Sequence, residues 1–175
     1  MTLEIATIVA LLTLSVPLPA VGDSPLRPPH RHTQCSPSGQ FCVTSDPQGG
    51  TFVHRAGEVG EPLWSIPKWF RVLYLADDPD LLVTGYDGQN LVPLDAPGDV
   101  EVLTFWSRGK VVRSYELSEL VADLGRLQRT ASHYHWGNYL GFDDEGNFRV
   151  TIVQGQTLVF DPAEGALVDR SRRID

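Results

Sequence analysis

The chain has 175 residues and a net charge of −8, with 14 Lys and Arg against 22 Asp and Glu. Its hydrophobic content of 42% is that of an ordinary globular protein, and its length suits one domain. Because nucleic acids and anionic membrane surfaces are bound through clustered positive charge, the composition excludes both as expected partners.

The amino-terminal 22 residues predict a cleaved signal peptide. The apolar run Ile5–Leu14 is too short to span a bilayer as a helix. The small residues Ala20 and Gly22 then offer a cleavage site. We therefore expect an exported protein, periplasmic or extracellular, without a membrane span.

Residues 23–34 are rich in proline and lack apolar periodicity, which predicts an extended linker before the folded domain. The domain is expected to begin at the first of two cysteines, Cys35 and Cys42. An exported protein can join such a pair in a disulfide.

The turn between the two cysteines leaves their pairing open. Residues 36–39 read Ser-Pro-Ser-Gly, the preferred composition of a type I turn. Followed by a glycine bulge, this turn sets Cys35 opposite Phe41 and turns Cys42 to the other face. A two-residue loop would instead set Cys35 opposite Cys42.

Three segments that each follow a turn share one four-residue pattern, in which an apolar residue and any second residue precede Val-Thr. They are Phe41–Thr44, Leu81–Thr84 and Phe148–Thr151. Alternation with a period of two predicts β-strands that bury one face. Each segment is followed by a strand pair around a glycine-containing turn or loop. The pattern predicts an all-β antiparallel meander of about three units that stack or close radially.

The segments Ser36–Phe41, Ala76–Tyr115 and Phe160–Val168 resemble blades of exported bacterial β-propeller-like repeat proteins of unassigned function, of the WD40-like or quinoprotein-like kind. The resemblance implies a propeller-like domain over residues 35–168, followed by a tail at 169–175. Three units are fewer than the roughly four to eight blades of a closed propeller. The resemblance thus implies an incomplete propeller or a homo-oligomer.

One short helix interrupts the strands. Ser118 is its expected amino-terminal cap and Gly125 its expected end. Helical spacing relates five apolar residues: Leu117, Leu120, Val121, Leu124 and Leu127.

The middle unit is lengthened by a loop that carries Tyr86, Gln89 and Asn90. Loops that extend one repeat commonly mark the binding face. Together with Trp136, these three residues are the predicted ligand-binding residues.

His133 and His135 are two apart, so on a strand both side chains point to one face and can ligate one zinc ion. A third ligand must come from elsewhere in the chain. The acidic clusters Asp77–Asp80 and Asp143–Asn147 are candidate calcium ligands, but tight-turn chemistry is the stronger explanation for such residues.

Taken together, these patterns favour a non-catalytic binding or scaffold module for an unknown protein or small-molecule ligand, without a cofactor. The alternative is a metal-dependent hydrolase that uses the His133 and His135 strand with one zinc or calcium ion.

Overall fold

The structure is a computed structural model that describes residues 25–58, 60–95 and 97–172. The predicted signal peptide at residues 1–22 lies outside the described residues. Within the described ranges, no helix is long and apolar enough to cross a membrane.

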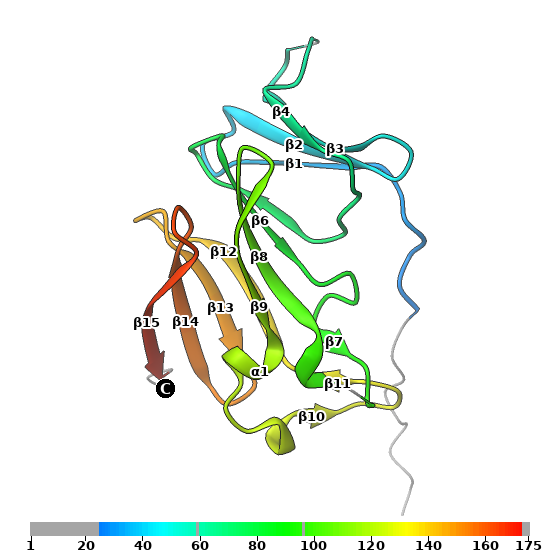
Figure 1. Cartoon of the computed structure of the whole chain (residues 1–175), viewed down its shortest axis with the longest axis vertical. Coiled ribbons are helices and arrows are strands. Elements are labelled where there is room, and N and C mark those ends of the chain that lie inside the picture. Colours follow the sequence, from blue (N-terminus) through cyan, green and yellow to red (C-terminus); the bar gives the residue numbers. More distant parts are fainter. Residues whose placement is uncertain (1–24, 59, 96, 173–175) are drawn as a thin grey trace, which may run out of the picture.

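Most strands of the described residues belong to three four-stranded antiparallel sheets (Figure 1). The N-terminal sheet contains β1 (His32–Cys35), β2 (Phe41–Asp46), β3 (Gly50–Arg55) and β4 (Trp64–Ile66). The middle sheet contains β5 (Leu73–Leu75), β6 (Leu81–Gly85), β8 (Glu101–Ser107) and β9 (Lys110–Glu116). The C-terminal sheet contains β12 (Gly137–Phe142), β13 (Phe148–Ile152), β14 (Gln156–Asp161) and β15 (Ala166–Arg172).

Short elements fill the connections between these sheets. A small three-stranded sheet is formed by β10 (Gln128–Arg129), β11 (Tyr134–His135) and β7 (Leu91–Val92). The helical elements are η1 (Pro97–Asp99), α1 (Leu117–Leu120) and η2 (Leu124–Arg126).

The predicted fold class is confirmed: over the described residues the protein is all-β, with antiparallel meanders in three propeller-like units and one short α-helix. The three Val-Thr segments lie in β2, β6 and β13, the second strand of each large sheet. Their valines, Val43, Val83 and Val150, are all completely buried.

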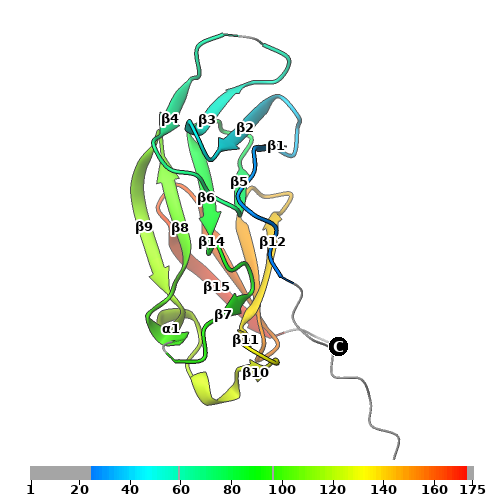
Figure 2. The same ribbon diagram turned by 90° about the vertical axis from the view of Figure 1, so that its right-hand side faces the viewer.

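The three large sheets follow one another in an arc, with the middle sheet between the other two (Figures 1 and 2). One apolar cluster joins the N-terminal and middle sheets through residues such as Val53 and Leu82. A second joins the middle and C-terminal sheets, where Phe105 packs against Phe148 and Phe160. The middle sheet therefore contributes apolar side chains to two separate clusters.

The predicted helix is shorter than its apolar spacing indicates. Glu116 occupies the N-cap position in place of Ser118, and the Glu116 N–H donates to the Glu119 carboxylate at 2.8 Å. The helix ends at Leu120, because Val121 is already extended. Asp123 then caps the separate η2 turn, so the apolar residues reach the core from two short elements instead of one.

The domain extends beyond both of its predicted limits, because β1 begins before residue 35 and β15 ends after residue 168. Residues 32–34 of the expected linker belong to β1, which pairs with β2. Residues 169–172 of the expected tail belong to β15, which pairs with β14. Neither segment shows a continuous apolar pattern, because edge strands need few buried side chains.

Cys35 and Cys42 form a disulfide across β1 and β2, where they are direct register partners. A β-turn over residues 36–39 is present, since the Gly39 N–H donates to the Ser36 carbonyl at 2.9 Å. However, the Ser36 N–H also bonds to the Phe41 carbonyl at 2.8 Å, so the loop includes Gln40. The register is therefore the one expected for a two-residue loop, with Cys35 opposite Cys42, although the loop that produces it is longer.

We expect replacement of both cysteines by alanine to lower the free energy of unfolding by about 2 kcal/mol, because the disulfide limits the unfolded chain. Urea denaturation of the double variant Cys35→Ala and Cys42→Ala measures the loss. Intact mass should show alkylation of the native protein only after reduction. Alkylation of both thiols without reduction would contradict the bridge.

Candidate functional site

The loop that follows β6 has a tightly defined backbone. The Gln89 N–H donates to the Tyr86 carbonyl at 2.8 Å, and the Leu91 N–H donates to the Gly88 carbonyl at 3.2 Å. Gln89 has a φ of 60°, in the left-handed region that residues with a side chain adopt infrequently. The Gln89 side chain is therefore held at an exposed position by a specific turn.

Tyr139 of β12 attaches this loop to the sheets. Its hydroxyl accepts a hydrogen bond from the Tyr86 N–H at 3.0 Å and donates one to the Val102 carbonyl of β8 at 2.6 Å. Burial raises the pKa of the Tyr139 phenol. The hydroxyl therefore keeps its proton and fills both roles at once.

The structure separates the predicted ligand-binding residues. Tyr86 and Gln89 line two neighbouring cavities. Asn90 directs its amide to the Asn138 side chain at 3.3 Å. Trp136 is 0% exposed, and its indole N–H donates to the Gln89 carbonyl at 3.1 Å. Trp136 thus supports the loop from within the core, which corrects its assignment as a ligand contact.

An extended N-terminal arm, residues 25–31, lies beside this loop and forms one wall of both cavities. The first cavity has a volume of about 570 Å³ and includes Tyr86 and His133 in its lining. The second has a volume of about 520 Å³ and includes Gln89. Arg71 lines both. We call the two cavities and the side chains between them the arm groove.

Arg71 lies at the centre of the arm groove. Its Nη1 donates to the Arg27 carbonyl of the arm at 2.8 Å, and its guanidinium carbon lies 5.0 Å from the centre of the Trp69 ring. Its backbone N–H donates to the Asp87 carboxylate at 3.4 Å. Its buried Nε–H has no hydrogen-bond partner among the described residues.

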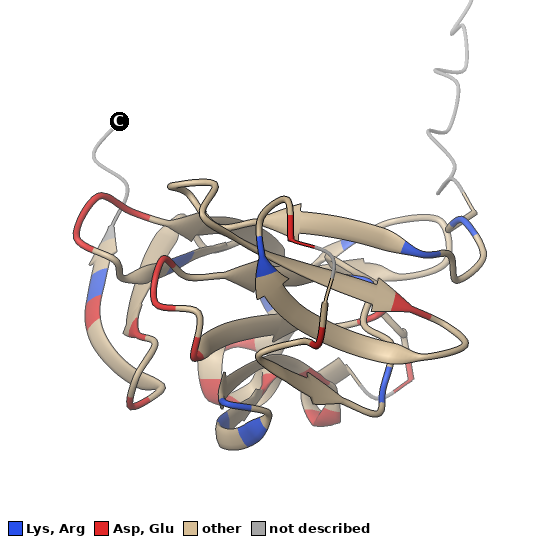
Figure 3. Cartoon of the chain, turned by 90° about the horizontal axis from the view of Figure 1, so that it is seen from above, with Lys and Arg blue, Asp and Glu red and all other residues tan. Residues whose placement is uncertain are grey.

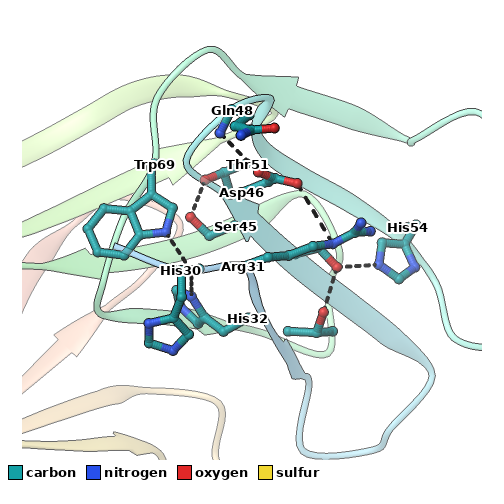
Figure 4. Close-up of polar contacts among 11 residues, drawn as sticks. His30, Arg31, His32, Ser45, Asp46, Gln48, Thr51, His54 and Trp69 are labelled. Atoms are coloured by element: carbon teal, nitrogen blue, oxygen red, sulfur yellow. Dashed lines mark hydrogen bonds and ion pairs between the residues drawn. The ribbon is translucent and has the colours of Figure 1, made fainter. Parts of the chain in front are cut away.

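His32 contributes a second buried atom of this kind. Its Nδ1 lies 3.2 Å from the His30 carbonyl and so carries the ring proton, which leaves Nε2 as an acceptor. Within the described part of the chain, this buried Nε2 has no partner. Figure 4 shows His32 close to His30 and Trp69.

The two histidines predicted as metal ligands lie in different local structures. His133 is in the turn before β11, where its carbonyl accepts from the Thr130 N–H at 2.9 Å and its Nδ1 lies 2.9 Å from the Ser132 hydroxyl. His135 is in β11, with a buried Nδ1. Over residues 25–58, 60–95 and 97–172, no group of three or more His, Cys, Asp or Glu is arranged to hold a metal. Metal binding by this pair stays a prediction.

The two acidic clusters meet across one cavity of about 620 Å³. Its lining includes Asp77, Asp78, Asp143, Asp144 and Glu145. Hydrogen bonds from the Ser38 hydroxyl and backbone N–H lower the pKa of Asp77. Asp78 and Asp143 accept N–H groups of their own turns at 3.0 and 2.9 Å. Figure 3 shows Asp and Glu on several loops between strands, positions that turn chemistry favours for Asp.

No family model and no curated protein sequence matches the chain. One similar solved structure is the crystal structure of the eukaryotic initiation factor, with a TM-score of 0.50 and 14% sequence identity. The match covers 88% of this chain but 34% of that chain, so this chain spans about a third of its neighbour's length. At this identity the likeness concerns the fold alone.

From the sequence, Trp69 is a candidate for an aromatic platform but is better explained by core packing, and no pattern indicates Arg71. The two residues lie between β4 and β5, in a segment without strand periodicity, and their partners Arg27 and His30 lie about forty residues away. The alternation of Trp69, Phe70 and Arg71 was the available signal: Phe70 is 3% exposed, whereas its two neighbours point outward to the arm.

We expect Tyr139→Phe to lower the free energy of unfolding by about 1–3 kcal/mol, because it leaves the Tyr86 N–H and the Val102 carbonyl without their shared partner. Chemical denaturation measures the change, and amide hydrogen exchange should increase in residues 86–90. Tyr74→Phe is the matched control, since its hydroxyl makes no hydrogen bond among the described residues. Equal effects of the two variants would refute the anchoring role.

Proposed function

We propose that the protein is an exported, non-catalytic binding module whose ligand site is the arm groove. The observation that carries this proposal is the lining of the groove by residues from separate parts of the chain: the arm, Arg71, the loop with Tyr86 and Gln89, and the turn with His133. Cavities of about 570 and 520 Å³ lie within the usual range of ligand sites, roughly 300–1,000 Å³.

The chemistry of the groove supports binding of a partly polar ligand. Arg71 presents a guanidinium that is stacked on Trp69, and Asp87 lies on the same side. Apolar surface is added by Leu26 and Leu91. A few polar groups placed among apolar ones is the usual composition of a specific ligand site.

The proposal of export has two supports. The signal peptide predicted for residues 1–22 is one, and the Cys35–Cys42 disulfide is the other. Disulfides persist mainly in oxidising compartments.

Ser132 is exposed and lines the larger cavity, so a bulky side chain at this position should fill the groove. We expect ligands found for the full chain on arrays of defined peptides and glycans to be lost with Ser132→Trp. They should be kept with Ser171→Trp, a matched exposed serine on β15. Ligands that Ser132→Trp leaves unaffected would place the binding site elsewhere.

The competing function is a metal-dependent hydrolase at His133 and His135. For a binding module we expect less than about 0.1 zinc, copper or iron per chain by elemental mass spectrometry, after purification without chelators or a histidine tag. About one metal per chain, lost together with hydrolytic activity in His133→Ala and His135→Ala, would replace our proposal with the hydrolase. Calcium alone would direct attention to the acidic loops.

A further inference from the structure

The arm is seated on the domain through its backbone carbonyls. The Arg71 guanidinium donates to the Arg27 carbonyl at 2.8 Å, and the Trp69 indole N–H donates to the His30 carbonyl at 3.1 Å (Figure 4 shows the second bond). The two carbonyls are three residues apart. In a polyproline II helix, which has three residues per turn, carbonyls at this spacing point in the same direction.

The residues between the two carbonyls favour this conformation. Pro28 and Pro29 fix φ near −65° and have no N–H group to donate. The arm therefore offers the domain an extended backbone with acceptors at a regular spacing, and its ordering costs little entropy.

The receiving surface is held in place independently of the arm. The Arg71 guanidinium lies over the Trp69 ring at 5.0 Å, and the Arg71 N–H is bonded to Asp87 at 3.4 Å. Between them, Phe70 is buried and its N–H donates to the Ser45 hydroxyl at 2.8 Å. We call Trp69 and Arg71 the arm platform.

The arm buries little of its own surface on this platform. Every residue from Pro25 to Arg31 is exposed, and Leu26 keeps 43% of its surface accessible. The Arg31 side chain is 72% exposed and lies 3.9 Å from Asp46, a distance typical of a weak surface ion pair. The cavities of the arm groove lie against Pro25 and Leu26, so the groove has room for more than the arm fills.

We infer that the arm platform is a binding site for an extended, proline-rich, basic peptide segment of a partner protein, and that the chain's own arm occupies it in the absence of that partner. This inference rests on the proposed function and names its ligand class: the partner segment takes the place of the arm as one wall of the arm groove. The preference for basic segments follows from the arm's own Arg27 and Arg31, from Asp46 and Asp87 beside the platform, and from the net charge of −8. Aromatic donors that hold an extended proline-rich backbone are a recurrent mode of peptide recognition.

A partner peptide must displace the arm, which is tethered to β1 and so present at a high effective concentration. Weakening the arm should therefore strengthen binding of an added peptide. The test uses a fluorescein-labelled peptide with the sequence SPLRPPHRH, that of residues 24–32, and measures anisotropy against the full chain and the full-chain variant Pro28→Gly, Pro29→Gly.

We expect the peptide to bind the glycine variant about tenfold more tightly than the native chain, because glycine removes the preformed arm conformation. Adding Trp69→Phe to this variant should abolish the gain, since the indole donor is lost. Trp64→Phe is the matched control: Trp64 also donates its indole N–H to a carbonyl, that of Pro79 at 2.8 Å. A peptide with its three prolines changed to glycine should bind at least tenfold more weakly than the original peptide.

Two results would overturn the inference: no saturable binding to the glycine variant below about 1 mM, or equal binding by the Trp69→Phe and Trp64→Phe forms. Circular dichroism and the disulfide mass confirm that each variant is folded. If the peptide does not bind, this inference fails, but the protein remains a binding module for another class of ligand. A stoichiometric metal with hydrolysis that depends on His133 would instead refute the proposed function.

Discussion

The fold depends on burial of β6, an inner strand of the middle sheet, on both faces. In β6, Leu82 packs toward the N-terminal sheet, and the next residue, Val83, packs toward the C-terminal sheet. A strand covered on both sides offers no polar face to water, so loss of either outer sheet exposes apolar surface. The three sheets therefore stabilise one another as a unit, and the loops at their ends take their positions from this stack.

Aromatic side chains extend this stack to the loops by donating hydrogen bonds to backbone carbonyls. Trp136 donates to Gln89, Tyr115 to Gly165 at 2.7 Å, and Trp64 to Pro79. Each ring packs against neighbouring residues while its polar end fixes a backbone segment far away in sequence. Trp69 holds the arm by the same chemistry, but at the surface, where the segment it binds can be exchanged.

The sequence was informative where structure follows from local alternation. Val43, Val83 and Val150 could be assigned to buried strand faces because a period of two leaves little choice. The register between β1 and β2 was harder to predict, because one additional loop residue, Gln40, brings Cys35 opposite Cys42. The length of the helix was overestimated, because the spacing of apolar residues does not show where the backbone leaves the helical conformation. The arm groove could not be predicted, because it joins residues that meet only after the sheets have packed.

The disulfide has a mechanical consequence for the amino terminus. The arm leads directly into β1, an edge strand held by β2 on one side only. A pull on the arm would ordinarily peel such a strand from its sheet, one hydrogen bond at a time, or allow it to exchange with the same strand of another molecule. The bond from Cys35 to Cys42 gives this unzipping a covalent stop. Peeling of β1 therefore stops at Cys35, and tension applied at the N terminus then passes through the disulfide to Cys42, inside β2.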